Sequence, residues 1–160
     1  MRHSVLVMNN FDFLVGTWDS VNHKLRKRLV GSDDWEDFPG RVTCYRAFDG
    51  AANIDEVVFP TLGHAGMSVR LYDPGTDLWS IYWASSKFPG PLEAPVVGRF
   101  VDGVGDFFSD EVQEGQAVRV RYRWSDITPT KARWAQAFST DDGATWETNW
   151  IMDFTRRAAA

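Results

Sequence analysis

The feature that most constrains the fold is a series of short runs rich in Val, Tyr, Trp and Phe, separated by segments rich in Gly, Asp and Pro. The runs are RVTCYRAF, NIDEVVF, MSVRLY, LWSIYWA, VVGRF, DFFSDEV, AVRVRYRW, ARWAQAF and TWETNWIMDF. DGAA, DPGTD, DGVG and STDDGA lie between runs and have the composition of tight turns. This pattern predicts an all-β antiparallel meander. The absence of a long amphipathic helix argues against a nucleotide-binding α/β fold.

A meander has exposed edge strands unless the sheet closes on itself. Closure of about eight to ten strands produces a barrel with room for one small ligand. We therefore predict a closed barrel, with a two-sheet sandwich as the alternative. The 160 residues are predicted to form one domain, residues 1–160, which buries roughly 70% of the surface that the unfolded chain exposes.

Three segments do not fit the strand pattern. NNFDFLVG predicts a short helical turn near the N-terminus, and KLRKRLV fits either a charged helical turn or an exposed strand. KFPGPLEAP, with its prolines, predicts either an ordered loop or a flexible lid over one mouth of the barrel.

Composition argues against several classes of function. The net charge of -5 is unsuited to binding a phosphate backbone, so we expect no nucleic-acid partner. The single cysteine, Cys44, cannot form an intramolecular disulfide, and its alternation with Val42 predicts a buried thiol rather than a nucleophile. The apolar run in MRHSVLVMNNF is too short for a signal peptide, and no stretch approaches the roughly 20 apolar residues of a membrane span. We therefore expect a cytoplasmic protein without membrane insertion.

FLVGTWDS contains Gly16, Thr17 and Trp18, which resemble the Gly-x-Trp signature that opens the first strand of lipocalins. In that superfamily an arginine near the end of the last strand packs over the tryptophan, and this chain has Arg156 and Arg157 there. The ordered set FDFLVGTWD, RLYDPGTDLWSIYW, VVGRF, RYRWSDITP and FSTDDGATWETNWIMDFTR is similar to an uncharacterised family of bacterial lipocalin-like proteins. The resemblance covers most of the chain and implies a lipocalin-like (calycin) β-barrel. It implies no assigned reaction and no catalytic residues.

STDDGATW, residues 139–146, fits the Asp-box of sialidase propellers. Such propellers repeat the box once per blade, whereas this chain has no internal repeat of that period. Asp141, Asp142 and Gly143 have the side-chain acceptor and the backbone freedom that a tight hairpin needs, with Trp146 packing beneath. The sequence has no convincing pair of glycosidase carboxylates. We therefore interpret the box as a hairpin turn.

Cofactor chemistry receives little support from the sequence. Nitrobindin-like members of the wider superfamily bind haem through a histidine late in the chain, whereas the histidines here are His3, His23 and His64. We expect no cofactor, and no metal because ligand-rich spacings are missing. His64 lies in TLGHAG, which predicts either a solvent-exposed loop or a position at the barrel mouth. A nucleophile elbow and a phosphate-binding loop are also missing.

The orientation of RVTCYRAF and NIDEVVF decides which polar side chains enter the barrel. If DGAA forms the simplest hairpin, Tyr45 opposes Glu56 on one face, and Arg46 opposes Asp55 on the other. We favour Tyr45 and Glu56 inside and the ion pair outside; a slip of one residue would reverse this. A carboxylate in an apolar barrel has a raised pKa and could be an acid, a base, a ligand acceptor or part of a structural network. The same inner face would carry Ala47, Ile54 and Val58.

RVRYRW has the cleanest alternation in the chain and predicts one apolar face and one face of arginines. The apolar set should point inward, whereas Arg119, Arg121 and Arg123 would form a solvated face, a homodimer surface or an anion site. The presence of eight tryptophans suits a flat or aromatic ligand, although tryptophan clusters also form filled cores. The inward set comprises Val118, Val120, Tyr122, Trp124, Trp134, Gln136, Phe138, Trp146, Thr148, Trp150 and Met152.

Three classes of function follow. The favoured one is a carrier or sensor that binds a small hydrophobic or aromatic molecule inside the barrel. The second is a cofactor-free enzyme, such as an isomerase or cyclase, in which Glu56 or Tyr82 transfers one proton. The third is an interaction module with a filled barrel. The candidate ligand-binding residues are Tyr45, Glu56, Tyr82, Tyr122, Trp124, Trp134, Gln136 and Trp150.

Overall fold

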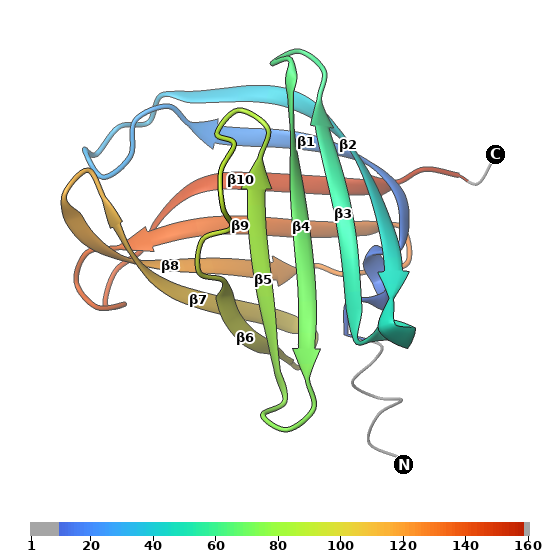
Figure 1. The fold of residues 1–160 in the computed structure, drawn as a ribbon. Coiled ribbons are helices and arrows are strands. Elements are labelled where there is room, and N and C mark those ends of the chain that lie inside the picture. Colours follow the sequence, from blue (N-terminus) through green and yellow to red (C-terminus); the bar gives the residue numbers. More distant parts are fainter. Residues whose placement is uncertain (1–9, 159–160) are drawn as a thin grey trace.

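The computed structural model describes residues 10–158, and its ten antiparallel strands form a closed barrel (Figure 1). Successive strands pair in chain order, and the first strand, β1 (Gly16–Leu25), closes the ring by pairing with the last, β10 (Glu147–Arg156). The predicted all-β barrel of eight to ten strands is thus confirmed, and the sandwich alternative is wrong. The segment MRHSVLVMN, considered above for a signal peptide, and His3 lie outside the described residues.

The remaining elements follow the predicted runs. Two short 3-10 helices are η1 (Asp12–Leu14) and η2 (Phe48–Gly50). The other strands are β2 (Trp35–Ala47), β3 (Ala52–Phe59), β4 (His64–Asp73), β5 (Leu78–Ser85), β6 (Val96–Val101), β7 (Val104–Gln113), β8 (Gln116–Ser125) and β9 (Lys131–Ser139).

The irregular segments take the following conformations. NNFDFLVG contains the expected helical turn, η1. KLRKRLV is neither a helix nor a whole strand, because Lys24 and Leu25 end β1 and the rest belongs to the loop that leads to β2. Leu29 has a positive φ of 62° in that loop, which prevents a helical turn from continuing there.

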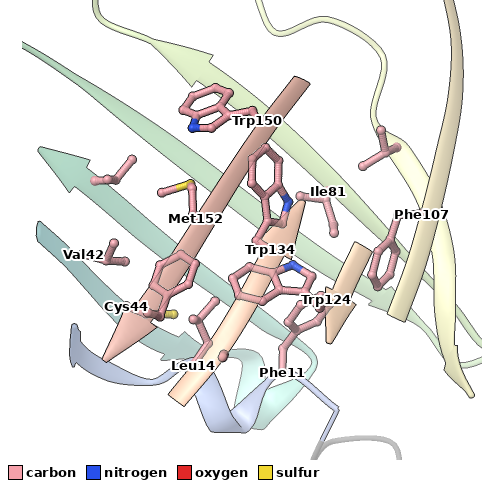
Figure 2. Packing of buried hydrophobic residues seen from close by; sticks show 14 of the residues in the cluster. Phe11, Leu14, Val42, Cys44, Ile81, Phe107, Trp124, Trp134, Trp150 and Met152 are labelled. Atoms are coloured by element: carbon pink, nitrogen blue, oxygen red, sulfur yellow. The ribbon is translucent and has the colours of Figure 1, made fainter. Parts of the chain in front are cut away.

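The η1 segment closes one end of the barrel from inside. Phe11 and Leu14 are 1% and 0% exposed, and the Phe11 ring lies 4.9 Å from the Trp79 ring in an edge-on arrangement. The Trp18 indole N–H donates to the Leu14 carbonyl at 2.9 Å, which fixes the helical turn to the first strand. Figure 2 shows Phe11 and Leu14 beneath Trp124, at the floor of the barrel. This end is filled with side chains.

Arg156 holds the closed end together in the manner that the lipocalin resemblance implies. Its guanidinium lies 4.1 Å from the Trp18 ring centre and donates hydrogen bonds to the carbonyls of Val15, Phe13 and Pro129. Gly16 makes room for it, because a Cβ there would lie 2.7 Å from Arg156 Nη1. One side chain of β10 therefore ties the N-terminal turn to the loop before β9.

Arg156→Ala is expected to lower the free energy of unfolding by about 2–3 kcal/mol, because it removes charge-assisted hydrogen bonds and a cation–π contact. The matched control is Arg157→Ala, whose exposed ion pair with Asp19 at 2.9 Å should cost no more than about 1 kcal/mol. Urea unfolding measures both. Equal losses in the two variants would show that Arg156 does not close the barrel.

The Asp-box forms the turn between β9 and β10. The Ser139 hydroxyl donates to Asp141 Oδ1 at 2.7 Å, and the Thr145 N–H donates to the same atom at 2.8 Å. Hydrogen bonds from Thr145, and then from Ser139, lower the pKa of Asp141 to about 2. Gly143 has a φ of 90°, and a Cβ there would lie 3.5 Å from the Trp146 ring, which packs beneath the turn as predicted.

Candidate functional site

The barrel interior contains a cavity of about 800 Å³. Its walls come from the inward faces of the strands, and its mouth lies at the end opposite η1. The mouth is lined by Leu62 and His64 where β4 begins and by Lys87, Phe88 and Glu93 in the loop between β5 and β6. The segment KFPGPLEAP therefore borders the opening, as expected. Small-molecule sites typically have volumes of about 300–1,000 Å³, so this cavity has the size of a ligand site.

Three tryptophans form one wall of the cavity. The rings of Trp134 and Trp150 lie 5.4 Å apart at 88°, and those of Trp83 and Trp150 lie 6.2 Å apart at 88°. The Trp150 N–H donates to Asn22 Oδ1 at 3.0 Å, and Asn22 is fully buried. The rings meet edge to face and do not stack on one another, and all three residues line the cavity. We call Trp83, Trp134 and Trp150 the tryptophan wall.

Five of the eight predicted site residues line this cavity. The alternation in RVRYRW brings Tyr122 and Trp124 inward, and the Tyr122 ring lies 5.1 Å from that of Trp134. Gln136 and Trp150 complete the group, and Gln136 donates to Asn149 Oδ1 at 2.8 Å. Figure 2 shows Trp124, Trp134 and Trp150 along the inner face of β8 to β10.

The orientation predicted for the other three residues is wrong. Tyr45 is 65% exposed, and Glu56 lies beside it on the outer face. Tyr82 alternates with the buried Trp79 and Ile81, so its side chain also points away from the cavity. The companions expected inside are outside too, with Ile54 and Val58 exposed by about two fifths.

The register of the hairpin between β2 and β3 also differs from the predicted one. Tyr45 pairs with Ile54 and Arg46 with Asn53, two positions away from the predicted partners, because the loop starts at Phe48 rather than at Asp49. A shift of two keeps Tyr45 and Glu56 on one face, but that face is the outer one. Cys44 and Val42, 2% exposed each, fill the inner face. Their alternation was the signal that could have placed Tyr45 outside.

A buried ion pair takes the place expected for Glu56. Asp55 Oδ2 lies 2.6 Å from Arg70 Nη1, and their side chains are 6% and 4% exposed. Arg70 also donates to Asn53 Oδ1 at 3.0 Å, and Asn53 donates to the Phe11 carbonyl at 3.3 Å. Asp55, Arg70 and the neighbouring Ser68 line the cavity. The deep part of the cavity is thus polar but internally charge-balanced.

Cys44 lies on the inner face of β2, as predicted, and is not arranged as a nucleophile. Burial raises the pKa of its thiol to about 12, because the desolvated thiolate is disfavoured. A thiol with such a pKa is protonated at neutral pH. Cys44 therefore serves as a small packing group beside Val42.

The inward orientation predicted for the residues at the start of β10 is also wrong. Trp146 and Thr148 were expected inside with Trp150, but the ladder shifts between Thr148 and Trp150, where Asn149 is an extra residue. Because of this β-bulge, the side chains before Asn149 point to the opposite face of the sheet from the one predicted. Trp146 therefore lies on the outside, and the Arg121 guanidinium sits 4.5 Å from its ring centre. Among the arginines of β8, Arg123 pairs with Asp106 through two hydrogen bonds of 2.7 and 3.1 Å.

Two cations extend over the aromatic rings near the mouth. Lys24 Nζ lies 4.2 Å from the centre of the Trp150 ring, and the Arg28 guanidinium lies 5.3 Å from that of Phe138. Burial lowers the pKa of Lys24, and the nearby Arg28 lowers it further. Desolvation also raises the pKa of Tyr122 far above its usual value, with Glu111 adding to the shift. KLRKRLV carries no periodic pattern, so the sequence does not predict that either cation lines the cavity.

Residues 10–158 were compared with the requirements of a metal site and of a membrane-spanning helix. In that part of the chain, no three His, Cys, Asp or Glu side chains are grouped as metal ligands would be. His64 is half-buried at the mouth, its ring 5.3 Å from that of Phe59. The two helices found there have three residues each, and neither could cross a membrane.

Comparison with known proteins supports the fold and does not assign a family. No protein-family profile and no curated protein matches the sequence. Among solved structures, Rv2717c from M. tuberculosis superposes with a TM-score of 0.59 at 13% identity, over 95% of this chain and 98% of that chain. The S-type phycobiliprotein lyase CPES from Guillardia theta has a TM-score of 0.42 at 13% identity, over 96% and 94%. The first likeness supports the fold alone, whereas the second is too distant to carry an argument.

Proposed function

We propose that this protein binds a small aromatic or apolar molecule inside the barrel and acts as its carrier or sensor. The observation that carries the proposal is the open cavity of about 800 Å³ with the tryptophan wall on one side. An interaction module was expected to have a filled barrel, so the open interior favours ligand binding. Within residues 10–158, the barrel is closed at one end by η1 and open at the other, so a ligand would enter at the open end.

The polar groups of the cavity are better suited to orienting a bound ligand than to transferring a proton. The two groups suggested for proton transfer, Glu56 and Tyr82, lie outside the cavity. The carboxylate that does line it, Asp55, is paired with Arg70 at 2.6 Å. Proton transfer by a carboxylate is hindered when a countercharge holds that carboxylate in its ionised form. These observations favour the carrier or sensor over the isomerase or cyclase. The cytoplasmic location and the homodimer stay predictions.

Binding can be tested by calorimetric titration with a panel of naphthalene, indole and short lipid-like compounds. We expect saturable one-site binding by at least one aromatic compound. Trp134→Leu should weaken it by roughly tenfold, since an aromatic contact contributes about 1.5 kcal/mol. The control is Trp146→Leu, which removes a tryptophan from the outer face and should leave the affinity unchanged. Equal weakening in both variants, or no binding across the panel, would contradict the proposal.

A further inference from the structure

Lys24 and Arg28 are the starting point, because both are half-buried at the cavity mouth and both line the cavity. Within residues 10–158, neither cation has a carboxylate oxygen within 4.0 Å. Each instead lies over an aromatic ring, Lys24 over Trp150 of the tryptophan wall and Arg28 over Phe138 of β9. A cation–π contact is worth about 0.5–2 kcal/mol and leaves the other N–H donors of the cation free.

No carboxylate of the described residues contacts Lys24 or Arg28, although at longer range Glu36 acts to raise the pKa of Lys24 and Glu147 that of Arg28. Arg70 is neutralised by Asp55. Glu36 lies 3.7 Å from Arg26, and Glu111 accepts hydrogen bonds from Ser109 and Gln113. The last two charges, Lys87 and Glu93, have opposite signs and are exposed in the loop between β5 and β6. Lys24 and Arg28 therefore place two positive charges at the cavity mouth, and neither has a countercharge in contact.

We propose that the ligand is an amphipathic anion whose apolar or aromatic body packs on the tryptophan wall and whose carboxylate-like group sits between Lys24 and Arg28 at the mouth. This inference rests on the proposed function, since it names the ligand class of the same cavity. A hydrogen bond that involves charged groups contributes about 1.5–3 kcal/mol, and an anion would replace the solvation that both cations lose on burial.

The direction in which the ligand enters follows from the charges. The deep end is closed by Phe11 and carries a balanced pair, so it offers no net attraction to an anion. The mouth offers two cations and remains in contact with solvent, which reduces the cost of desolvating the anionic group. The apolar end should therefore lead into the barrel. Because the net charge is -5, selectivity for an anion has to come from these local cations.

The test compares two probes of similar shape, naphthoate and uncharged naphthylmethanol. Calorimetry with the wild-type protein should show naphthoate binding at least tenfold more tightly. In Lys24→Met combined with Arg28→Met, naphthoate affinity should fall by about 10–100-fold, as expected for one or two lost charge-assisted contacts. Naphthylmethanol affinity should change by less than about threefold, since the contact with the wall is apolar. Lys131→Met, on the exposed start of β9, controls for the loss of positive charge.

The outcomes separate this inference from the proposed function. If naphthylmethanol binds as tightly as naphthoate, or if the Lys24 and Arg28 variants weaken both probes equally, the anion assignment is wrong while the cavity still binds ligands. If neither probe binds the wild-type protein, the anion assignment fails, and the proposed function fails with it when no other compound of the panel binds. A circular dichroism melt of each variant confirms that the barrel is intact, and the single variants serve if the double variant unfolds.

Discussion

Replacement of Arg70 by Met is expected to lower the free energy of unfolding by about 3–5 kcal/mol, because it leaves the Asp55 carboxylate buried without its partner. Arg70 Nη1 lies 2.6 Å from Asp55 Oδ2 and also donates to Asn53 Oδ1 at 3.0 Å. Loss of the guanidinium therefore removes a countercharge and a donor in one step. Equilibrium unfolding in urea measures the effect.

The double variant Asp55→Leu with Arg70→Met separates the cost of an orphaned charge from the net worth of the pair. Buried pairs replaced by apolar side chains of similar size are often neutral for stability. We expect the double variant to recover at least half of the loss caused by Arg70→Met alone. A single variant that costs less than about 1 kcal/mol, or a double variant as unstable as the single one, would contradict a desolvated pair.

Trp150→Ala is expected to cost about 3–5 kcal/mol of stability, the range seen when a large buried aromatic side chain is truncated. Two effects add. The ring is 8% exposed and touches both Trp83 and Trp134, and its N–H is the donor to the fully buried Asn22. Affinity for naphthoate should also fall by at least tenfold, because the centre of the tryptophan wall is lost.

Trp150→Phe helps to separate the two effects, since it keeps an aromatic ring while it deletes the N–H donor and part of the ring volume. We expect it to cost about 1–3 kcal/mol, the penalty for leaving the Asn22 oxygen unsatisfied, while naphthoate still binds. Trp146→Ala, on the outer face, is the matched control for tryptophan truncation and should cost far less than Trp150→Ala. A loss from Trp146→Ala as large as that from Trp150→Ala would show that the wall does not dominate the core.

The barrel and most of the tryptophan wall could be predicted from the sequence because the relevant strands alternate cleanly. In RVRYRW every second residue is apolar and the others are arginines, so only one face can point inward. The turn residues between the runs then fix the antiparallel order, and closure follows from the need to protect the edges. Trp83 was the exception, since LWSIYWA has apolar residues on both faces.

The orientation of β2 and β3 could not be settled by hydrophobicity alone. On β2 the inner residues Val42 and Cys44 are apolar, whereas on β3 the inner face carries Asn53 and Asp55 and the outer face carries Ile54, so the two strands give conflicting signals. Asn53 and Asp55 are tolerated inside because Arg70 arrives from β4, a contact between residues distant in the sequence. The bulge at Asn149 likewise depends on the partner strand, which local composition does not specify.

The most direct test of ligand binding inside the barrel is fluorine NMR of protein labelled with fluorotryptophan, recorded with and without saturating naphthoate. The resonances are assigned by single Trp→Phe variants. The proposal predicts that the signals of Trp83, Trp134 and Trp150 shift, whereas that of Trp146 on the outer face does not. A shift confined to Trp146, or no shift at any naphthoate concentration, would contradict binding within the cavity.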